Sequence, residues 1–524
     1  MAAAQGDPTT PQLEKSDSSR PESDIEKALS SDGSSEEEIS PYVEQRQAEE
    51  ARDVTTFRGK LAAFTIRLSQ YGVETRGVVP TAPEARTDTR FWNLLFLWIS
   101  ANFNILAFST GSLGPAIFAL GLKESLLVIF FINLLSATLP AYFSTFGPRL
   151  GMRQMIVSRY SFGFYGNIIP SLLNLITFMG FLILNLILGG ETLAAVSGYQ
   201  AGHGGGLSWD IGIAIVGVIA LLASHISITY YIPTHPGGCH ILYIQVTFCG
   251  YKVLYTYERF AWIPIVMVYI VALGCGGKQL TDLAPVVPAS SVTVLCFAAS
   301  IAGYMISWST LASDYTIYLD QSAPNSKVFL FAYSGFFFPN VICEMVGAAF
   351  AVSMHAPGNE AWLDGYKVNN VGGLLDEVMR PAGGSIPLAM VGAHTYYTSL
   401  ISFTGVIGYW AAAWASIVLA EHVLFRQSHT GASTGITTTT AGYDSTAWND
   451  PSALPTGIPA LAAFALSFAL IVPAMNQVWF QGPIGRRVGD IGFELAFIVA
   501  GGLYSVFRRV EKKVCVGRAG GLGS

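Results

Sequence analysis

Acidic side chains within long apolar stretches are the first feature of this sequence that could do chemistry. Glu191, Glu344 and Glu494 lie inside such stretches, and Asp314 lies near the end of another. A carboxylate in an apolar zone is costly and is a functional candidate by default, because it can bind and release a proton there. Glu344, in the middle of its stretch, is the first choice. A carboxyl paired with a donor on a neighbouring helix is the alternative interpretation.

A second feature is an interrupted apolar stretch at residues 102–118 (NFNILAFSTGSLGPAIF), which contains Ser109, Gly111, Gly114 and Pro115. A break in a membrane helix frees backbone donors and acceptors, and this is tolerated only where they face a cavity or a ligand. The interruption therefore predicts a binding site. The alternative is that Gly111 and Gly114 allow close packing of two helices.

These residues lie in a chain dominated by apolar segments. Of the 524 residues, 51% are hydrophobic and only 12% are charged, and the mean hydropathy is +0.45. A hydrocarbon core of about 30 Å needs about 20 helical residues to cross it. Ten stretches meet this requirement, so the sequence predicts an all-α, polytopic membrane protein. They lie near 93–119, 124–146, 167–197, 209–227, 260–276, 292–318, 328–354, 403–425, 454–477 and 490–508.

The sixth of these spans is also interrupted. Residues 300–319 (SIAGYMISWSTLASDYTIYL) contain Gly303, Trp308 and several hydroxyl side chains, with Asp314 near the end. Two interrupted helices five spans apart are typical of an inverted-repeat transporter, in which each half contributes one discontinuous helix to a central site. The pair of breaks is a stronger indication than either break alone.

Basic residues in the short loops predict the orientation, because they favour the cytoplasm. With ten spans, most basic residues near the membrane fall on one side together with both termini: Arg149, Arg153, Arg159, Lys252, Arg259, Arg426, Arg508, Arg509, Lys512 and Lys513. Arg486 and Arg487 remain on the opposite face. A full crossing by residues 385–402 would place Arg426 outside, so we expect a partial, re-entrant or packed segment there.

Composition also divides the chain. Residues 1–90 are rich in Ser, Pro, Glu and Asp and lack the apolar residues that offset the entropy of ordering, so we expect a disordered cytoplasmic tail. Residues 91–513 form the predicted transmembrane domain, and residues 514–524 form a second cytoplasmic tail.

Several function classes are excluded. The net charge of -6 with no basic block gives no footprint for nucleic acid. The six cysteines lie far apart without C-x-x-C spacing, so neither a disulfide framework nor a metal site is expected. No cofactor is implied, and no motif of nucleophile and base indicates an enzyme. The oligomeric state is left open.

Six strings, in this order, resemble the fungal purine-cytosine permeases of the nucleobase cation symporter family: WISANFNILAFSTGSLGP, GPRLGMRQMIVSRYSFGFYGN, GYKVLYTYERFAWIP, SWSTLASDYTIYL, GYWAAAWASIVLAEHVLFR and GPIGRRVGDIGFELAF. The resemblance covers most of residues 91–513. It implies a LeuT-type five-plus-five inverted repeat followed by two extra helices, in the plasma membrane. The implied activity is import of cytosine and purines with protons by alternating access, so the small-molecule partner would be a nucleobase.

The resemblance also assigns site residues. Phe181 and Asn185 are four residues apart and share a helix face, and they match positions where family members stack a base and hydrogen-bond its edge. Trp308 matches the aromatic residue that covers the other face of the base, while Ser109 and the backbone near Gly111 could satisfy its polar atoms. Phe181 replaces the family's tryptophan and offers less ring area and no indole donor. Without the resemblance, ordinary packing explains both rings, and an interhelical hydrogen bond explains Asn185.

Two segments depart from the family. Residues 224–246 (SHISITYYIPTHPGGCHILYIQV) form an unfamiliar insertion with the character of translated intervening sequence. Only about 20 residues, near 385–404, separate Gly384 from the string that resembles the family's tenth helix. About two spans are therefore missing, including an Asn-rich stretch that contributes to substrate binding in the family. Removing two spans together keeps the topology but removes one wall of the site.

The sequence therefore predicts a secondary active transporter of cytosine and purines. Three alternatives stay open. The first is a permease for another heterocycle, such as allantoin or a vitamin. The second is a membrane receptor that binds a base without moving it, and the third is a defective splice product. In the transporter interpretation, Glu344, Glu191 and Asp314 are the candidates for proton coupling.

Overall fold

The computed structural model describes residues 77–197, 206–225, 227–231, 241–245, 250–281, 288–382, 396–426, 439–440, 442–445 and 447–521. Helices make up most of this part of the chain. Two short antiparallel pairs of strands accompany them: β1 (Ser227–Tyr231) pairs with β2 (Ile241–Gln245), and β3 (Thr439–Thr440) pairs with β4 (Tyr443–Asp444).

The helices of the first half follow the first five predicted spans. They are α4 (Phe91–Asn102), α5 (Ile105–Ala116), α6 (Leu122–Ser136), α7 (Thr138–Ser144), α8 (Phe146–Leu150), α9 (Gln154–Phe162), α10 (Ile168–Val196), α11 (Trp209–His225) and α12 (Gly250–Gly276), with the short η1 (Pro83–Ala85) before them. The helix α12 begins at Gly250, before the predicted span at 260–276. The prediction started late because it followed apolar composition, and the first turns of α12 contain several polar residues.

The second half contains α13 (Ser291–Ser307), η3 (Trp308–Thr310), η4 (Ala312–Tyr315), α14 (Asn325–Ser353), α15 (Glu360–Met379), α16 (Tyr396–Ala420), the π-helical segment η6 (Glu421–Arg426), α17 (Ile458–Ala474), α18 (Gly485–Val488) and α19 (Gly492–Gly521). Short 3-10 turns lie at η2 (Gln279–Thr281), η5 (Arg380–Ala382) and η8 (Ala447–Asn449). The helix α15 was not predicted. It is amphipathic in composition and is kinked at Asn369 and Asn370, whose backbone angles are not helical.

The membrane-spanning character predicted from the sequence is present in these helices. Among the described residues, six helical segments are long and apolar enough to cross a membrane: Leu122–Leu150, Ile168–Ala194, Glu258–Gly276, Ser291–Thr310, Asn325–Ser353 and Phe403–Arg426. The bent pair α4–α5 meets the same criteria when its two helices are taken together, and as one broken span it would make a seventh crossing. The helix α17 and the first part of α11 are shorter apolar helices, and α19 covers the tenth predicted span.

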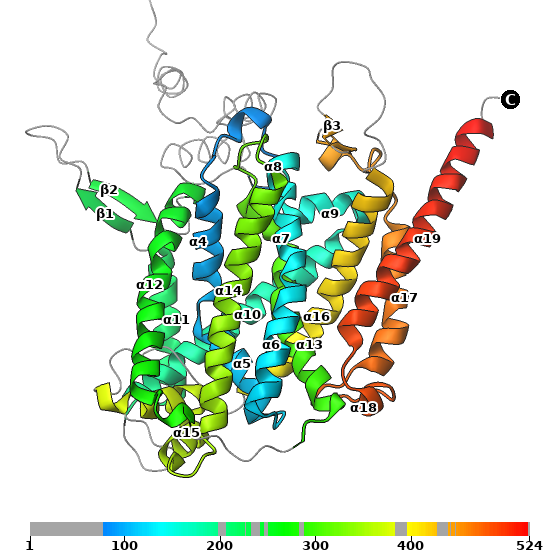
Figure 1. Ribbon diagram of the computed structural model, residues 1–524. Coiled ribbons are helices and arrows are strands. Elements are labelled where there is room, and N and C mark those ends of the chain that lie inside the picture. Colours follow the sequence, from blue (N-terminus) through cyan, green and yellow to red (C-terminus); the bar gives the residue numbers. More distant parts are fainter. Residues whose placement is uncertain are drawn as a thin grey trace, which may run out of the picture. The chain divides into compact units, whose positions relative to one another are not determined.

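Close helix packing organises the interior (Figure 1). The helices α5 and α14 touch backbone to backbone, because a Cβ atom on Gly111 would lie 2.0 Å from the carbonyl oxygen of Glu344 and one on Gly347 would lie 2.0 Å from that of Phe108. Gly303 of α13 lies against Thr404 of α16 in the same way. Small residues permit such close approaches. The resulting van der Waals contacts stabilise the helix pairs, because the hydrophobic effect does not drive helices together inside a membrane.

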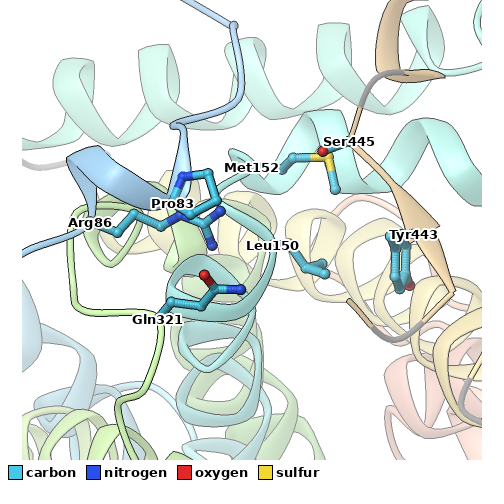
Figure 2. Close-up of a pocket in the computed structure, with 7 residues that line it drawn as sticks. All are labelled: Pro83, Arg86, Leu150, Met152, Gln321, Tyr443 and Ser445. Carbon is cyan, nitrogen blue, oxygen red and sulfur yellow. The ribbon is translucent and has the colours of Figure 1, made fainter. Parts of the chain in front are cut away.

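Residues 77–90 correct the predicted boundary of the polar tail. Thr81 donates its backbone N–H to Gly151 at 2.7 Å, and the buried Arg86 side chain donates to the carbonyl of Pro148 at 2.8 Å. Figure 2 shows Arg86 at a small cavity that Leu150 and Tyr443 also line. The predicted end of the tail at residue 90 is therefore too late, because polar residues here find backbone partners at the ends of helices.

Three further expectations meet the structure in part. Residues 396–402 form the first turns of α16 and not a separate re-entrant segment, while 383–395 lie outside the described residues. The predicted tail at 514–524 continues α19 as far as Gly521. The described parts of the insertion at 224–246 form the β1–β2 pair after the end of α11.

Candidate functional site

The break in the first span lies between α4 and α5, whose axes differ by 54°. Asn104 stabilises this bend: its Oδ1 accepts a hydrogen bond from the Ala107 N–H at 2.8 Å, and its Nδ2 donates to Tyr304 Oη at 3.3 Å. The predicted interruption is thus present, but it precedes Ser109 and Gly111. Both of these lie within helix α5, where Pro115 has no N–H to donate to the carbonyl of Gly111 one turn earlier. The predicted freeing of backbone near Gly111 is therefore limited to this carbonyl.

The structure places Ser109 and Gly111 in helix packing. Ser109 is fully buried, and its Oγ donates to the carbonyl of Ile105 at 2.9 Å. Gly111 lies against the backbone of Glu344 in α14. For Gly111 the geometry therefore fits the packing alternative, because a side chain at this position would collide with α14.

The break in the sixth span lies within the predicted stretch at 300–319 and begins at Trp308. Regular helix α13 ends at Ser307, and two 3-10 turns follow. Thr310 Oγ1 donates to the side-chain oxygen of Asn174 on α10 at 2.5 Å. Asn174 therefore ties the unwound segment to the third span. No sequence signal separated this asparagine from other polar residues of the span.

Aromatic rings gather between α10, α13 and α16. We call Phe178, Phe181, Tyr304, Trp308 and Phe403 the aromatic cluster. Phe181 is 9% exposed, and its ring centroid lies 5.1 Å from that of Phe403 and 5.9 Å from that of Tyr304. Phe178 lies 6.2 Å from both Phe181 and Trp308. The two predicted stacking residues thus belong to one cluster and are linked by Phe178, which the sequence analysis missed.

Asn185 lies beside this cluster but does not enter it. Its side chain is exposed, and its Nδ2 donates to the carbonyl of Phe181 in the preceding turn at 2.8 Å. The neighbouring Leu182 and Ile183 are also exposed. The shared helix face predicted for Phe181 and Asn185 is therefore divided, since the ring points inward and the amide lies on the exposed side.

Three buried donors beside the cluster lack partners within the described residues. They are Trp98 Nε1, Trp308 Nε1 and Ser309 Oγ. The rings of Trp98 and Trp308 lie 5.6 Å apart, edge to face, and Ser309 is fully buried in the turn after α13. Leaving a buried polar group unpaired costs about 1–3 kcal/mol. Such groups suit a ligand that carries hydrogen-bond acceptors.

A buried carboxyl lies on α14, which packs against α5. Glu344 is fully buried in α14, and its Oε2 accepts a hydrogen bond from Asn133 Nδ2 of α6 at 2.6 Å. Its Oε1 and the Asn133 Oδ1 have no partner among the described residues. The titratable side chains near Glu344 are the phenol of Tyr304 and the thiol of Cys343. Glu344 therefore meets one neutral amide and no positive charge there.

The other predicted carboxylates have different surroundings. Asp314 Oδ1 accepts a hydrogen bond from the Gln154 N–H at 2.6 Å, and Asp314 Oδ2 lies 4.0 Å from the Arg153 guanidinium. Asp314 therefore caps the start of α9, and this structural role explains its position without a role in proton coupling. Glu494 lies in the first turn of α19, where its Oε2 is buried and lacks a partner within the described part. The side chain of Glu191 lies outside the described residues.

Comparison with known proteins identifies the family. Residues 81–375, more than half of the chain, match the model of a family described as permeases for cytosine/purines, uracil, thiamine and allantoin. The chain belongs to this permease family. It is 28% identical to the purine-cytosine permease fcyB of Emericella nidulans over 85% of this chain and 90% of that one. It is 29% identical to the purine-cytosine permease FCY2 of Saccharomyces cerevisiae, over 87% and 89% of the two chains.

A solved structure supports the same fold. The chain is similar to Mhp1, a nucleobase-cation-symport-1 family transporter solved in a closed conformation with bromovinylhydantoin bound, with a TM-score of 0.53 and 14% identity. The match covers 84% of this chain and 96% of that one. The predicted class of all-helical, LeuT-type transporter is confirmed, and so is the prediction that the chain is not an enzyme.

Proposed function

We propose that this permease imports cytosine and purine bases across the plasma membrane, coupled to protons, by alternating access. One observation carries the proposal: at the break of the sixth span, the buried donors of Trp98, Trp308 and Ser309 have no partner among the described residues, and they lie at or beside the aromatic cluster. A nucleobase is planar and carries acceptors in its ring, so it can stack on the rings and accept from these donors. The similarity to purine-cytosine permeases supports the same substrate class.

In this proposal, Phe181 and Trp308 stack on the base, and Ser109 would bond the base from α5 only by giving up its hydrogen bond to the carbonyl of Ile105. Asn185 would bond the edge of the base after a rotamer change, because its Nδ2 now donates to its own helix. Discrimination follows from the buried donors. A ring that lacks an acceptor at the matching position would leave a donor unpaired, and sites of this kind reject such analogues strongly.

Glu344 is the proposed proton carrier. Its carboxyl is fully buried and is held by Asn133 of a neighbouring span, with no basic side chain among its described contacts. A buried carboxyl in this position is most stable when neutral, and loss of its proton would need compensation from another change in the site. Coupling of proton release to base release would follow. Both termini would lie in the cytoplasm, as the basic residues of the loops favour.

The experiment is uptake of labelled cytosine by this chain in cells that lack their own nucleobase permeases, with and without a protonophore. We expect accumulation that the protonophore abolishes. Competition with unlabelled uracil, thiamine and allantoin, the other substrates named for the family, identifies a different heterocycle. Surface expression with cytosine binding but no accumulation would favour a receptor and contradict the transport proposal.

Two variants test the assigned roles. Asn185→Ala should abolish uptake with normal surface expression, whereas Leu182→Ala, an equally exposed neighbour on α10, should transport normally. Glu344→Gln should keep exchange of labelled for unlabelled base and lose accumulation driven by a pH gradient. Wild-type uptake by Asn185→Ala would refute its role in binding. Accumulation by Glu344→Gln would show that the proton is carried elsewhere.

A further inference from the structure

The connection between α17 and α19 forms a rigid hairpin. The Gln477 N–H donates to Phe480 at 2.8 Å, the Gly482 N–H donates to Met475 at 2.9 Å, and the Ile484 N–H donates to Pro473 at 2.9 Å. These bonds form a ladder that places Val478 and Trp479 at the tip of a tight turn. The first residues of the hairpin belong to the end of α17, so its direction is set by that helix.

The base of the hairpin is fixed to two other helices. Asp490 is fully buried and accepts hydrogen bonds from the Asn476 N–H at 3.0 Å and from Gln477 Nε2 at 2.8 Å. Gln477 Nε2 also donates to Tyr409 Oη of α16 at 2.6 Å, and the Gly492 N–H at the start of α19 donates to Asp490 at 3.0 Å. The tip is therefore held in one position relative to α16 and α19.

The fixed tip exposes apolar side chains together with two arginines. The exposed fractions are 61% for Val478 and 60% for Trp479, and Phe480, Ile484 and Val488 are also exposed. Arg486 and Arg487 follow within α18 and are exposed too. An exposed apolar patch beside positive charge marks a contact surface. We call residues 478–480, 484 and 486–488 the hairpin surface.

We infer that the hairpin surface lies at a boundary of the membrane, because it connects two predicted spans. It joins two neighbouring helices, α17 and α19, and Arg508 and Arg509 lie further along α19, at the far end of the predicted span 490–508. Arg486 and Arg487 are the basic residues that the positive-inside rule leaves unexplained. Among the described residues, the carboxylate of Asp490 lies nearby in the chain, but it is buried and bonded within the base of the hairpin.

We propose that the hairpin surface binds an anionic phospholipid, with Trp479 and Phe480 at the level of the glycerol backbone and both arginines on the headgroup phosphate. Aromatic rings gather at this depth in membrane proteins because one side meets hydrocarbon and the other meets water. Guanidinium groups form bidentate bonds with phosphate. This proposal does not depend on which base the permease carries.

Quenching of Trp479 fluorescence gives a readout local to the surface. The full chain, purified in detergent, is titrated with brominated phosphatidylserine or brominated phosphatidylcholine, and the signal of Trp479→Phe in the same background is subtracted. We expect brominated phosphatidylserine to quench half of the Trp479 signal at a lower concentration than brominated phosphatidylcholine does. An arginine near an anionic lipid contributes about 1 kcal/mol, or about fivefold. R486Q/R487Q should therefore raise the half-quenching concentration of phosphatidylserine about 25-fold.

A matched control removes the same charge at the other end of α19. R509Q/K513Q alters two exposed basic residues there and should leave quenching of Trp479 unchanged. Equal half-quenching by wild type and R486Q/R487Q would refute the role of the arginines. Absence of Trp479 quenching would refute contact with lipid, and dimerisation that shields Trp479 would assign the surface to a second copy. Displacement of the lipid by equimolar inorganic phosphate would indicate a simple anion site and overturn the lipid assignment.

Discussion

Replacing Gly111 by alanine should destabilise the protein, because α5 and α14 meet there through their backbones. The added Cβ would lie 2.0 Å from the oxygen, 2.3 Å from the Cα and 2.4 Å from the carbonyl carbon of Glu344. Ordinary contacts of a Cβ atom are 3.4–4 Å, so the helices must separate by more than an ångström. All three opposing atoms are backbone atoms and cannot turn away as a side chain does.

The magnitude follows from two opposing effects. Overpacking of a close interior contact costs about 1–3 kcal/mol, and backbone opposition places Gly111→Ala at the upper end. The gain in helix propensity from glycine to alanine is about 1 kcal/mol. The expected net loss in the free energy of unfolding is therefore about 2 kcal/mol. Gly347→Ala, which would place its Cβ 2.0 Å from the carbonyl oxygen of Phe108, should behave in the same way.

The assay is thermal unfolding of detergent-purified protein, followed by the loss of the monodisperse peak in size-exclusion chromatography. The control is Gly274→Ala in α12, where no atom lies within 4 Å of the added Cβ, and this variant should be as stable as wild type or more so. Equal stability of Gly111→Ala and Gly274→Ala would refute the packing argument. If Gly111→Ala is stable but loses uptake, Gly111 contacts the substrate, as its place in the first span suggested.

Two further predictions concern polar groups at the ends of the helices. Asp490 accepts hydrogen bonds from both Tyr409 Oη and Gln477 Nε2. Asp490→Asn should lower the thermal stability, because the new amide NH2 would meet these two donors, and a hydrogen bond to a charged group contributes about 1.5–3 kcal/mol. The exposed Asp450→Asn serves as the control, and equal unfolding temperatures of the two variants would contradict the role of Asp490. Burial raises the pKa of Tyr160, which lies in α9 outside the spans, to about 12. Its protonated form therefore contributes stability that is complete below pH 10 and is lost as the pH rises to about 12. Tyr160→Phe should flatten the decline in stability over this window, and an unchanged alkaline unfolding curve would show that another group controls it.

Fold class and spans could be predicted from the sequence because the membrane imposes a length and an apolarity on each helix. An interruption within residues 300–319 could also be predicted, since several hydroxyl side chains follow an apolar helix there, but Gly303 lies in regular helix and only the structure places the break at Trp308. The break in the first span was placed a few residues late. The glycines and Pro115 drew attention to the middle of α5, but the bend depends on Asn104, whose partner Tyr304 lies 200 residues away in the chain.

Other features were decided only by tertiary structure. Apolar periodicity indicates that Phe181 lies in a helix, but the packing of α10 against α13 and α16 decides that its ring faces Tyr304 and Phe403 while Asn185 stays exposed. The role of Gly111 depends in the same way on α14. The residue type alone does not distinguish a glycine at a helix break from a glycine where two helices cross.

The sequence by itself determined which residues lie in the membrane, because burial in lipid depends on composition summed over a whole helix. Only the tertiary structure decided which polar atoms remain without partners, because hydrogen bonds join residues on different spans. Asn133 and Glu344 are 211 positions apart, yet their side chains lie 2.6 Å from each other. Trp98 Nε1, Trp308 Nε1 and Ser309 Oγ each lack a partner within the described part of the chain, which no local pattern could reveal.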